Sequence, residues 1–278
     1  MSTAVGAAPG AADADRAGSR TALLQHVVPW LAFVLALAAW EGGVRAFSIP
    51  QWLLPAPSAI ASELLAQPRV FAMHALVTSG EIVLGFLLSV AVGIPLAFGI
   101  AYSKVFERTL YPLLVASQAV PKVAIAPLLI VWFGFGTLPK VIVAFLIAFF
   151  PIVIDTVVGL RSVQPEMLHL ARSMGATGWQ TFRKIRLPKA LPSIFAGFKV
   201  AITLSVVGAI VGEFVAADRG LGYLLMVASG EMNSRLLFAA IIVLTLIGVA
   251  FFLLIEALER WCIPWHAADA HEGLHGGA

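Results

Sequence analysis

Histidine and cysteine are the side chains of this sequence best suited to bind metals or act as nucleophiles, and their placement argues against both roles. All six histidines avoid the centres of the apolar segments: His26, His74, His169, His266, His271 and His275. None is placed to activate a buried serine, bind a haem or ligate a metal within a membrane. The last three could form a metal site, although a solvated tail is the simpler interpretation. Cys262 is the one cysteine, which excludes an intrachain disulfide and a cysteine-based metal cluster. We therefore expect no catalytic residue and no bound metal.

A glycine-rich stretch, Gly134–Lys140, superficially resembles a phosphate-binding loop. Its glycine spacing is wrong, no serine or threonine follows Lys140, and it joins two apolar segments. The chain therefore contains no nucleotide-binding motif of its own. If ATP drives its function, we expect another chain to hydrolyse it.

Carboxylates inside apolar segments are candidates for a transport pathway, because a charge at mid-bilayer costs about 3 kcal/mol and is rarely kept without a role. Glu213 comes closest to such a position, and Asp155 lies toward the inner end of its segment. Two interpretations of Glu213 stay open. It lines the pathway, or it lies at the membrane interface and pairs with Arg219 or Lys140.

The longest polar interval between apolar segments runs from Arg161 to Pro192 and is strongly basic. Against a single acid, Glu166, it carries six basic residues: Arg161, Arg172, Arg183, Lys184, Arg186 and Lys189. Pro188 and Pro192 are expected to separate it from the next apolar segment. A polar helical hairpin embedded in a very apolar chain indicates a docking element.

Local signals divide this interval into two short helices. Pro165 suits the first position of a helix, where its missing N–H costs nothing. Gly175 is expected to end that helix in a positive-φ conformation. Thr177 and Gln180 predict a capping box at the start of the second helix.

The spacing of this hairpin resembles the cytoplasmic "EAA" loop of ABC-importer permeases, whose pattern is E-A-A, three residues, G, nine residues, I-x-L-P. The G…I-x-L-P half is intact, whereas two of the three E-A-A positions differ and a histidine replaces the glutamate. In that family the loop's helix lies in a groove on the ATPase subunit and transmits its motion. The resemblance implies this set of coupling residues: His169, Leu170, Ala171, Gly175, Ala176, Ile185, Leu187 and Pro188. The alternative is a basic amphipathic hairpin held at the inner leaflet by anionic lipid, which would not require this fixed spacing.

Two further stretches resemble the nitrate, sulfonate and taurine branch of these permeases. One is the series Pro121, Pro127-Leu128 and Trp132-Phe133-Gly134-x-Gly136, and the other is the GLGY element after Arg219. The resemblance covers roughly Leu76 to Trp265. It implies alternating access in a homodimer, membrane lipid around it, two cytoplasmic ABC ATPase subunits that carry ATP and Mg²⁺, and an extracytoplasmic substrate-binding protein. The expected substrate is a sulfonate, nitrate, taurine or a pyrimidine vitamin precursor. The residues around GLGY look more like those of the vitamin-precursor members.

The composition places the chain in a membrane. Its 278 residues are 60% hydrophobic and 12% charged, against about 45–50% and 25% in soluble domains. We predict an all-α integral membrane fold, with six transmembrane helices and a cytoplasmic coupling hairpin at 161–192, between the fourth and fifth spans. The predicted spans are 27–47, 76–102, 110–135, 141–160, 194–215 and 236–258. The first could instead be a signal peptide. The transmembrane domain is expected over 23–265, with a disordered tail at 1–22 and a polar tail at 266–278.

The basic residues have a topological explanation, so a formal net charge of +3 does not indicate nucleic-acid binding. In the predicted layout eleven basic residues lie in inner segments and five in outer segments. This bias predicts a multi-pass protein of the plasma (cell inner) membrane, with both termini and the hairpin in the cytoplasm.

Three classes of function can be compared with these features. An ABC-importer permease explains the hairpin, the six spans and the absence of a nucleotide motif. An ion-coupled secondary transporter would more often show buried coupling acids and an internal repeat, and neither is evident. An intramembrane enzyme needs a nucleophile or metal set, which the histidine placement argues against. The sequence favours the permease.

Overall fold

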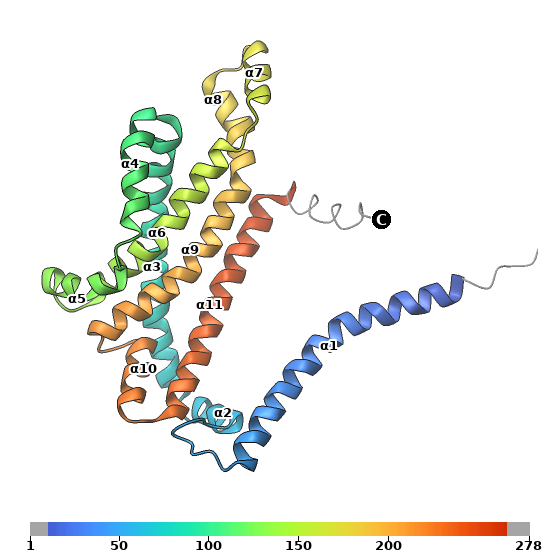
Figure 1. The fold of residues 1–278 in the computed structure, drawn as a ribbon, viewed down its shortest axis with the longest axis vertical. Coiled ribbons are helices and arrows are strands. Elements are labelled where there is room, and N and C mark those ends of the chain that lie inside the picture. The colour runs from blue at the N-terminus through green and yellow to red at the C-terminus, as the bar shows by residue number, and fades with distance from the viewer. Residues whose placement is uncertain (1–10, 266–278) are drawn as a thin grey trace, which may run out of the picture.

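A computed structural model describes residues 11–265, and that part of the chain is helical without any strand. The helices are joined mostly by short turns (Figure 1). Their bounds are α1 Ala11–Ala46, α2 Pro57–Ala66, α3 Pro68–Tyr102, α4 Lys104–Ser117, α5 Lys122–Phe133, α6 Thr137–Arg161, α7 Pro165–Ser173, α8 Gly178–Thr181, a π-helical turn Phe182–Arg186, α9 Leu187–Ala216, α10 Leu221–Gly230 and α11 Ser234–Cys262. The predicted all-α fold is confirmed.

Five spans in the described part are long and apolar enough to cross a membrane, and α4 with α5 supplies a sixth if the bent pair counts as one span. The predicted third span, 110–135, is therefore wrong as a continuous helix, because α4 and α5 meet at 94°. The bend falls at residues 118–121, just where Pro121 takes an extended conformation with φ −70° and ψ 92°. Proline offers no N–H to continue the ladder of α4.

The centre of the bundle is formed by α3, α6 and α9, with α6 packed along both of the others. Small residues allow this close approach, as they do in many membrane helices. At Gly208 of α9 an added Cβ would lie only 2.5 Å from the Cα of Ala144 on α6. The side chains that surround this contact are apolar and buried, so these three helices form a tightly packed core that connects both ends of the molecule.

Helix α1 stands away from this core (Figure 1). Its last turns contact α2, where the hydroxyl of Ser58 donates a 2.7 Å hydrogen bond to Glu41. The apolar stretch Val28–Ala46 agrees with the predicted first span and remains largely exposed. The helix itself begins at Ala11, within the segment 1–22 that was expected to be a disordered tail. Residues 1–10 and the histidine-rich tail 266–278 lie outside the described residues.

Two further differences from the sequence analysis concern α9 and the outer connection. The hairpin is not separated from the fifth span, because the π-helical turn leads directly into α9. Pro188 lies in the first turn of α9, and Pro192 is accommodated inside the helix. The predicted loop between the last two spans contains a short helix, α10.

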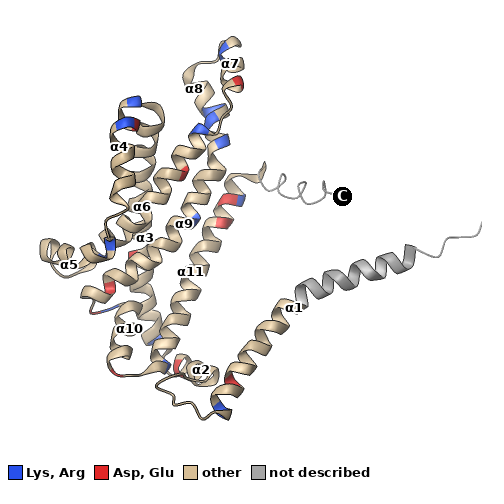
Figure 2. Cartoon of the chain, in the orientation of Figure 1, with Lys and Arg blue, Asp and Glu red and all other residues tan. Residues whose placement is uncertain are grey.

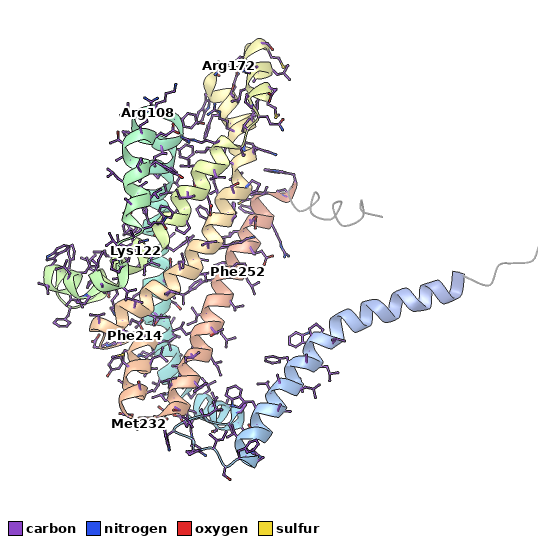
Figure 3. All side chains as sticks on the ribbon, viewed as in Figure 1. Arg108, Lys122, Arg172, Phe214, Met232 and Phe252 are labelled. Carbon is purple, nitrogen blue, oxygen red and sulfur yellow. The ribbon has the colours of Figure 1, made fainter. Side chains whose placement is uncertain are left out.

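Charge divides the bundle into two ends, which we name the inner end, carrying α7 and α8, and the outer end, carrying α2 and α10. Lysine and arginine gather at the inner end (Figure 2). Arg108 and Arg172 both lie there, whereas Met232 lies at the outer end (Figure 3). Helix α11 returns the chain to the inner end.

Candidate functional site

The helical hairpin at the inner end folds as its local signals predict. Pro165 opens α7, and Gly175 follows its end with φ +75°. The N–H of Ala176 donates to the carbonyl of Ala171 at 3.0 Å, and the N–H of Gly175 donates to that of Arg172 at 2.9 Å. This pair of bonds is a Schellman motif, which requires the left-handed conformation that glycine adopts without strain.

The predicted capping box is present at the start of α8. The N–H of Gln180 donates to the hydroxyl of Thr177 at 3.3 Å, and the Gln180 side chain accepts from the N–H of Thr177 at 2.8 Å. Two orphan donors of the helix are thereby satisfied. The hairpin thus has a defined corner between a Schellman motif and a capping box.

The hairpin has two arms, α7 as the first and α8 with the π-helical turn as the second. Aromatic contacts fix the second arm to α3. Phe182 packs edge-on against Phe98, with ring centroids 5.6 Å apart, and lies 5.5 Å from Trp179. The guanidinium of Arg186 lies over the ring of Tyr102, 5.1 Å from its centroid, a cation–π contact. The base of the hairpin is therefore held against the inner end of α3.

A second anchor lies at the end of α6, just before the hairpin. Arg161 pairs with Glu107 of α4 at 2.9 Å and donates to the carbonyl of Ile100 at 3.1 Å. These bonds tie the inner ends of α3, α4 and α6 together. The first arm of the hairpin, α7, leaves the bundle from this fixed point.

In contrast to its base, α7 presents apolar side chains to solvent. Leu170 is 62% exposed, Met174 is 78% exposed, and Met167 is about half exposed. Ala171 is buried, and His169 is exposed on the same helix. Arg172 has no ion pair within residues 11–265. An exposed apolar ridge with unpaired positive charge beside it is typical of a protein interface.

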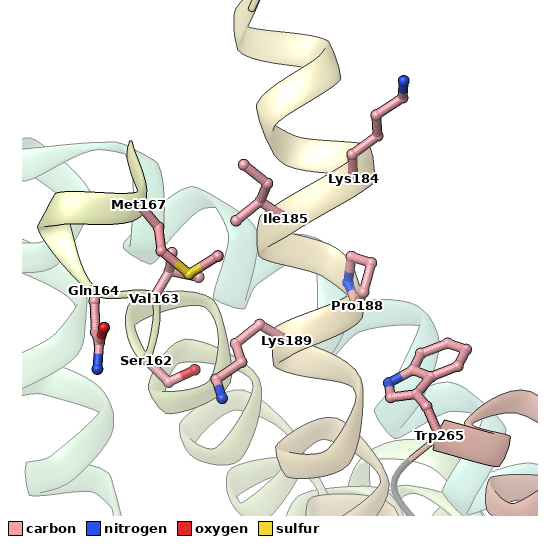
Figure 4. Close-up of a pocket in the computed structure, with 9 residues that line it drawn as sticks. All are labelled: Ser162, Val163, Gln164, Met167, Lys184, Ile185, Pro188, Lys189 and Trp265. Carbon is pink, nitrogen blue, oxygen red and sulfur yellow. The ribbon is translucent and has the colours of Figure 1, made fainter. Parts of the chain in front are cut away.

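A cavity of about 420 Å³ lies between the two arms and the end of α11 (Figure 4). Ile185 and Pro188 line one wall, Val163 and Met167 face them, and Trp265 closes the side toward α11. The cavity lies between the first arm of the hairpin and the end of the last span.

At the outer end, five polar side chains of α3, α6 and α9 form a buried group that we name the outer polar cluster: His74, Thr78, Glu81, Lys140 and Glu213. Each is less than 7% exposed. The ammonium of Lys140 pairs with Glu81 at 2.5 Å. The hydroxyl of Thr78 donates to Glu213 at 2.6 Å, and the N–H of Gly222 donates to the same carboxylate.

The sequence-predicted residues therefore fall into three separate places. The eight coupling residues lie together in the hairpin and the first turn of α9. Glu213 lies in the outer polar cluster, not with Arg219, which lies beside Asp218. Asp155 lies in the inner half of α6, against α9 at Gly197, and the structure does not bring it to Glu213.

Sequence reasoning missed Glu81, Thr78 and His74 as members of one site. Their spacing of four and three residues places them on one face of α3, a polar stripe on a very apolar helix, and this was the available signal. Among residues 11–265 no group of three or more histidine, cysteine or acidic side chains is arranged to hold a metal ion.

Comparison with known proteins decides the family. Residues 89–263 match the model of the family described as "Binding-protein-dependent transport system inner membrane component". The chain belongs to this family. It is a multi-pass membrane permease of the ABC-importer type, as the hairpin resemblance predicted.

Several known permeases are similar to this chain over most of their length. The riboflavin transport permease RibX of Chloroflexus aurantiacus is 38% identical over 84% of this chain and 88% of its own. The formylaminopyrimidine transport permease ThiX of Halalkalibacterium halodurans is 37% identical over 87% and 96%. The taurine transport permease TauC of Escherichia coli is 30% identical over 83% and 86%.

The fold of this permease also occurs in a solved transporter. An inward-facing structure of the MetNI methionine ABC transporter matches with a TM-score of 0.60 at 17% identity, covering 70% of this chain and 97% of that chain. At this identity the match concerns the fold alone. The match supports a bundle of transmembrane helices and carries no information about the substrate.

Proposed function

We propose that this permease works as a homodimer with two ABC ATPase subunits, and that its hairpin, residues 161–192, is the element that binds them. The observation that carries the proposal is the construction of the hairpin. Its base is fixed by Phe182, Arg161 and Arg186, whereas α7 projects with Leu170 and Met174 exposed. Such a helix needs a partner groove, since an exposed apolar ridge gains free energy when a partner covers it.

In this proposal ATP and Mg²⁺ bind to the ATPase subunits, and this chain carries no cofactor. When the ATPase pair closes, the docked α7 moves with it. Because the second arm continues without interruption into α9, the motion reaches the transmembrane core as displacement of one helix against α6. Alternating access follows from that displacement, and substrate is delivered on the outer side by an extracytoplasmic binding protein.

For the substrate we propose a small nitrogen heterocycle of the vitamin or vitamin-precursor type in preference to a sulfonate, nitrate or taurine. The riboflavin and formylaminopyrimidine permeases are 37–38% identical to this chain, whereas the taurine permease is 30% identical. The decisive measurement is uptake by the complete importer with riboflavin, formylaminopyrimidine and taurine as competitors. Competition by taurine alone would reverse the order.

The docking role is tested by co-purification of the ATPase with Leu170→Asp. A carboxylate on the exposed apolar ridge should abolish association and uptake while membrane abundance stays near that of the parent. Met226→Asp is a matched control, because Met226 is about half exposed at the outer end. Full association and uptake in Leu170→Asp would remove the hairpin from the coupling role. Uptake that persists without any ATPase would favour an ion-coupled transporter instead.

The orientation in the plasma (cell inner) membrane, with both termini and the hairpin in the cytoplasm, is tested by single cysteines in a Cys262→Ser background. Ser173 in α7 and Ser229 in α10 are both exposed. An impermeant maleimide should label Ser229→Cys in intact cells and Ser173→Cys only after permeabilisation. The reverse pattern would invert the topology.

A further inference from the structure

Helix α9 joins the two ends of the molecule. It begins at Leu187, directly after the hairpin, and ends at Ala216, so it spans about 45 Å at 1.5 Å per residue. Glu213 lies in its last turn, buried in the outer polar cluster. Any displacement of α9 therefore moves this carboxylate.

The outer polar cluster holds the start of α10. Helix α10 has no capping side chain of its own. Instead, three successive N–H groups at its start donate to side chains of other helices: Gly220 to Nδ1 of His74 at 2.9 Å, Leu221 to Thr78 at 2.8 Å, and Gly222 to Glu213. The first N–H groups of a helix have no partner within it, and a carboxylate there is favoured by the helix dipole.

The charges of the cluster are arranged so that Glu213 can stay buried. His74 accepts a hydrogen bond at Nδ1, so that nitrogen carries no proton and the ring is neutral. Glu81 and Glu213 adjoin each other, and within residues 11–265 the ammonium of Lys140 pairs with Glu81 beside them. Without Lys140 two carboxylates would face each other in a dry site, which is strongly unfavourable.

We propose that Glu213 is a positioning residue that fastens the start of α10, and with it the outer loop 217–220, to the end of α9. The ammonium of Lys140 offsets the negative charge that Glu81 and Glu213 bring into the cluster. The outer loop and α10 then follow α9, so a movement that begins at the hairpin is carried to the outer surface of the permease. The attachment of α10 to α9 depends on the outer polar cluster alone. The claim that the hairpin moves α9, and α10 with it, rests on the proposed function.

The test uses a buried reporter in α10. Leu224 is 6% exposed, so Leu224→Cys, in a Cys262→Ser background, should react slowly with an impermeant maleimide added from outside. Glu213→Ala should raise that rate about tenfold or more, because two hydrogen bonds to a buried carboxylate are lost. Glu213→Gln should restore slow labelling, since its amide oxygen still accepts from Gly222. Glu231→Ala is the control, because Glu231 is an exposed acid at the other end of α10.

Charge balance is tested separately. Lys140→Met should also raise the labelling rate, and adding Glu81→Gln in the same chain should bring it back toward the parent value, because one carboxylate is then removed along with one ammonium. A purely steric role of Lys140 predicts no rescue. Unchanged labelling in Glu213→Ala, or failure of Glu81→Gln to rescue Lys140→Met, would overturn the proposal.

A further measurement in the complete importer separates positioning from simple stability. A non-hydrolysable ATP analogue should change the labelling rate of Leu224→Cys in the parent and leave it unchanged in Glu213→Ala, while ATPase still co-purifies with both. If the ATPase did not co-purify with the parent permease, the proposed docking function would be wrong. If the ATPase co-purified with Glu213→Ala and the ATP analogue still changed the labelling rate of that variant, the inference about Glu213 would be wrong.

Discussion

The inner hairpin and the outer polar cluster hold their polar groups in opposite ways. In the cluster each charged side chain is buried and meets a partner from another helix, with Lys140 on Glu81 and Glu213 on Thr78. In the hairpin the exposed side chains of α7 have few partners within residues 11–265, and apolar Leu170 and Met174 face solvent. The charged groups of the cluster thus meet partners within this chain, whereas in the proposed function a partner covers the apolar side chains of the hairpin.

This difference separates two consequences of mutation. Changes to the packed core and outer end should lower the amount of folded protein, because burial and internal pairing stabilise them. Changes to α7 should leave folding intact and lower transport, because its free energy of contact is realised only in a complex. The predictions below test this separation.

The largest expected effect is in the packed core. Gly208→Val places side-chain atoms against the backbone of α6, since even the Cβ would lie 2.5 Å from the Cα of Ala144. Overpacking typically costs about 1–3 kcal/mol, and a backbone neighbour cannot yield as a side chain can. We expect membrane abundance and thermal stability to fall sharply, with uptake falling in proportion. Gly80→Val is the control, because nothing lies within 4 Å of its added Cβ. Equal abundance of the two variants would contradict this packing.

The hairpin variant Gly175→Val should show the opposite pattern. Open space surrounds this glycine, so its φ of +75° is the reason a β-branched residue is unfavourable, at about 1–3 kcal/mol. The strain disturbs the Schellman motif and misdirects α7. Uptake and ATPase association should fall much more than membrane abundance, with Gly175→Ala milder.

Gly178→Val is the matched control for this variant, since Gly178 lies in the same hairpin, has open space and lacks positive φ. Uptake and ATPase association should stay near the parent values in the control. Normal uptake in Gly175→Val would show that the direction of α7 is not needed for coupling. Equal losses in both variants would point to the added side chain rather than to the backbone conformation.

The hairpin was largely predictable from the sequence because its signals are local. Pro165, Gly175 and the pair Thr177 and Gln180 each act within a few residues, and the structure confirms all three signals. Proline signals were less reliable. Pro188 was expected to interrupt the chain, yet it fits the first turn of α9.

The outer polar cluster could not be predicted in the same way. The polar stripe on α3 is visible in the sequence, but Thr78 and Glu213 are 135 residues apart, so only the packing of α3 against α9 brings them together. The sharp bend between α4 and α5 is a similar case. Pro121 marks where the helix breaks, whereas the angle between the two pieces depends on what they pack against.

The smallest expected effect concerns the capping box. Thr177→Ala removes the oxygen that accepts from the N–H of Gln180 and should cost about 1 kcal/mol. The box lies at the corner between the two arms, and the second arm remains anchored by Phe182 against α3. The loss should therefore loosen the corner without disturbing the core, so ATPase association weakens by about fivefold at unchanged membrane abundance. Thr177→Ser keeps the cap and should restore association. If Thr177→Ala lowered abundance as strongly as Gly208→Val, the hairpin would be part of the folded core, and the contrast between the two ends of the molecule would fail.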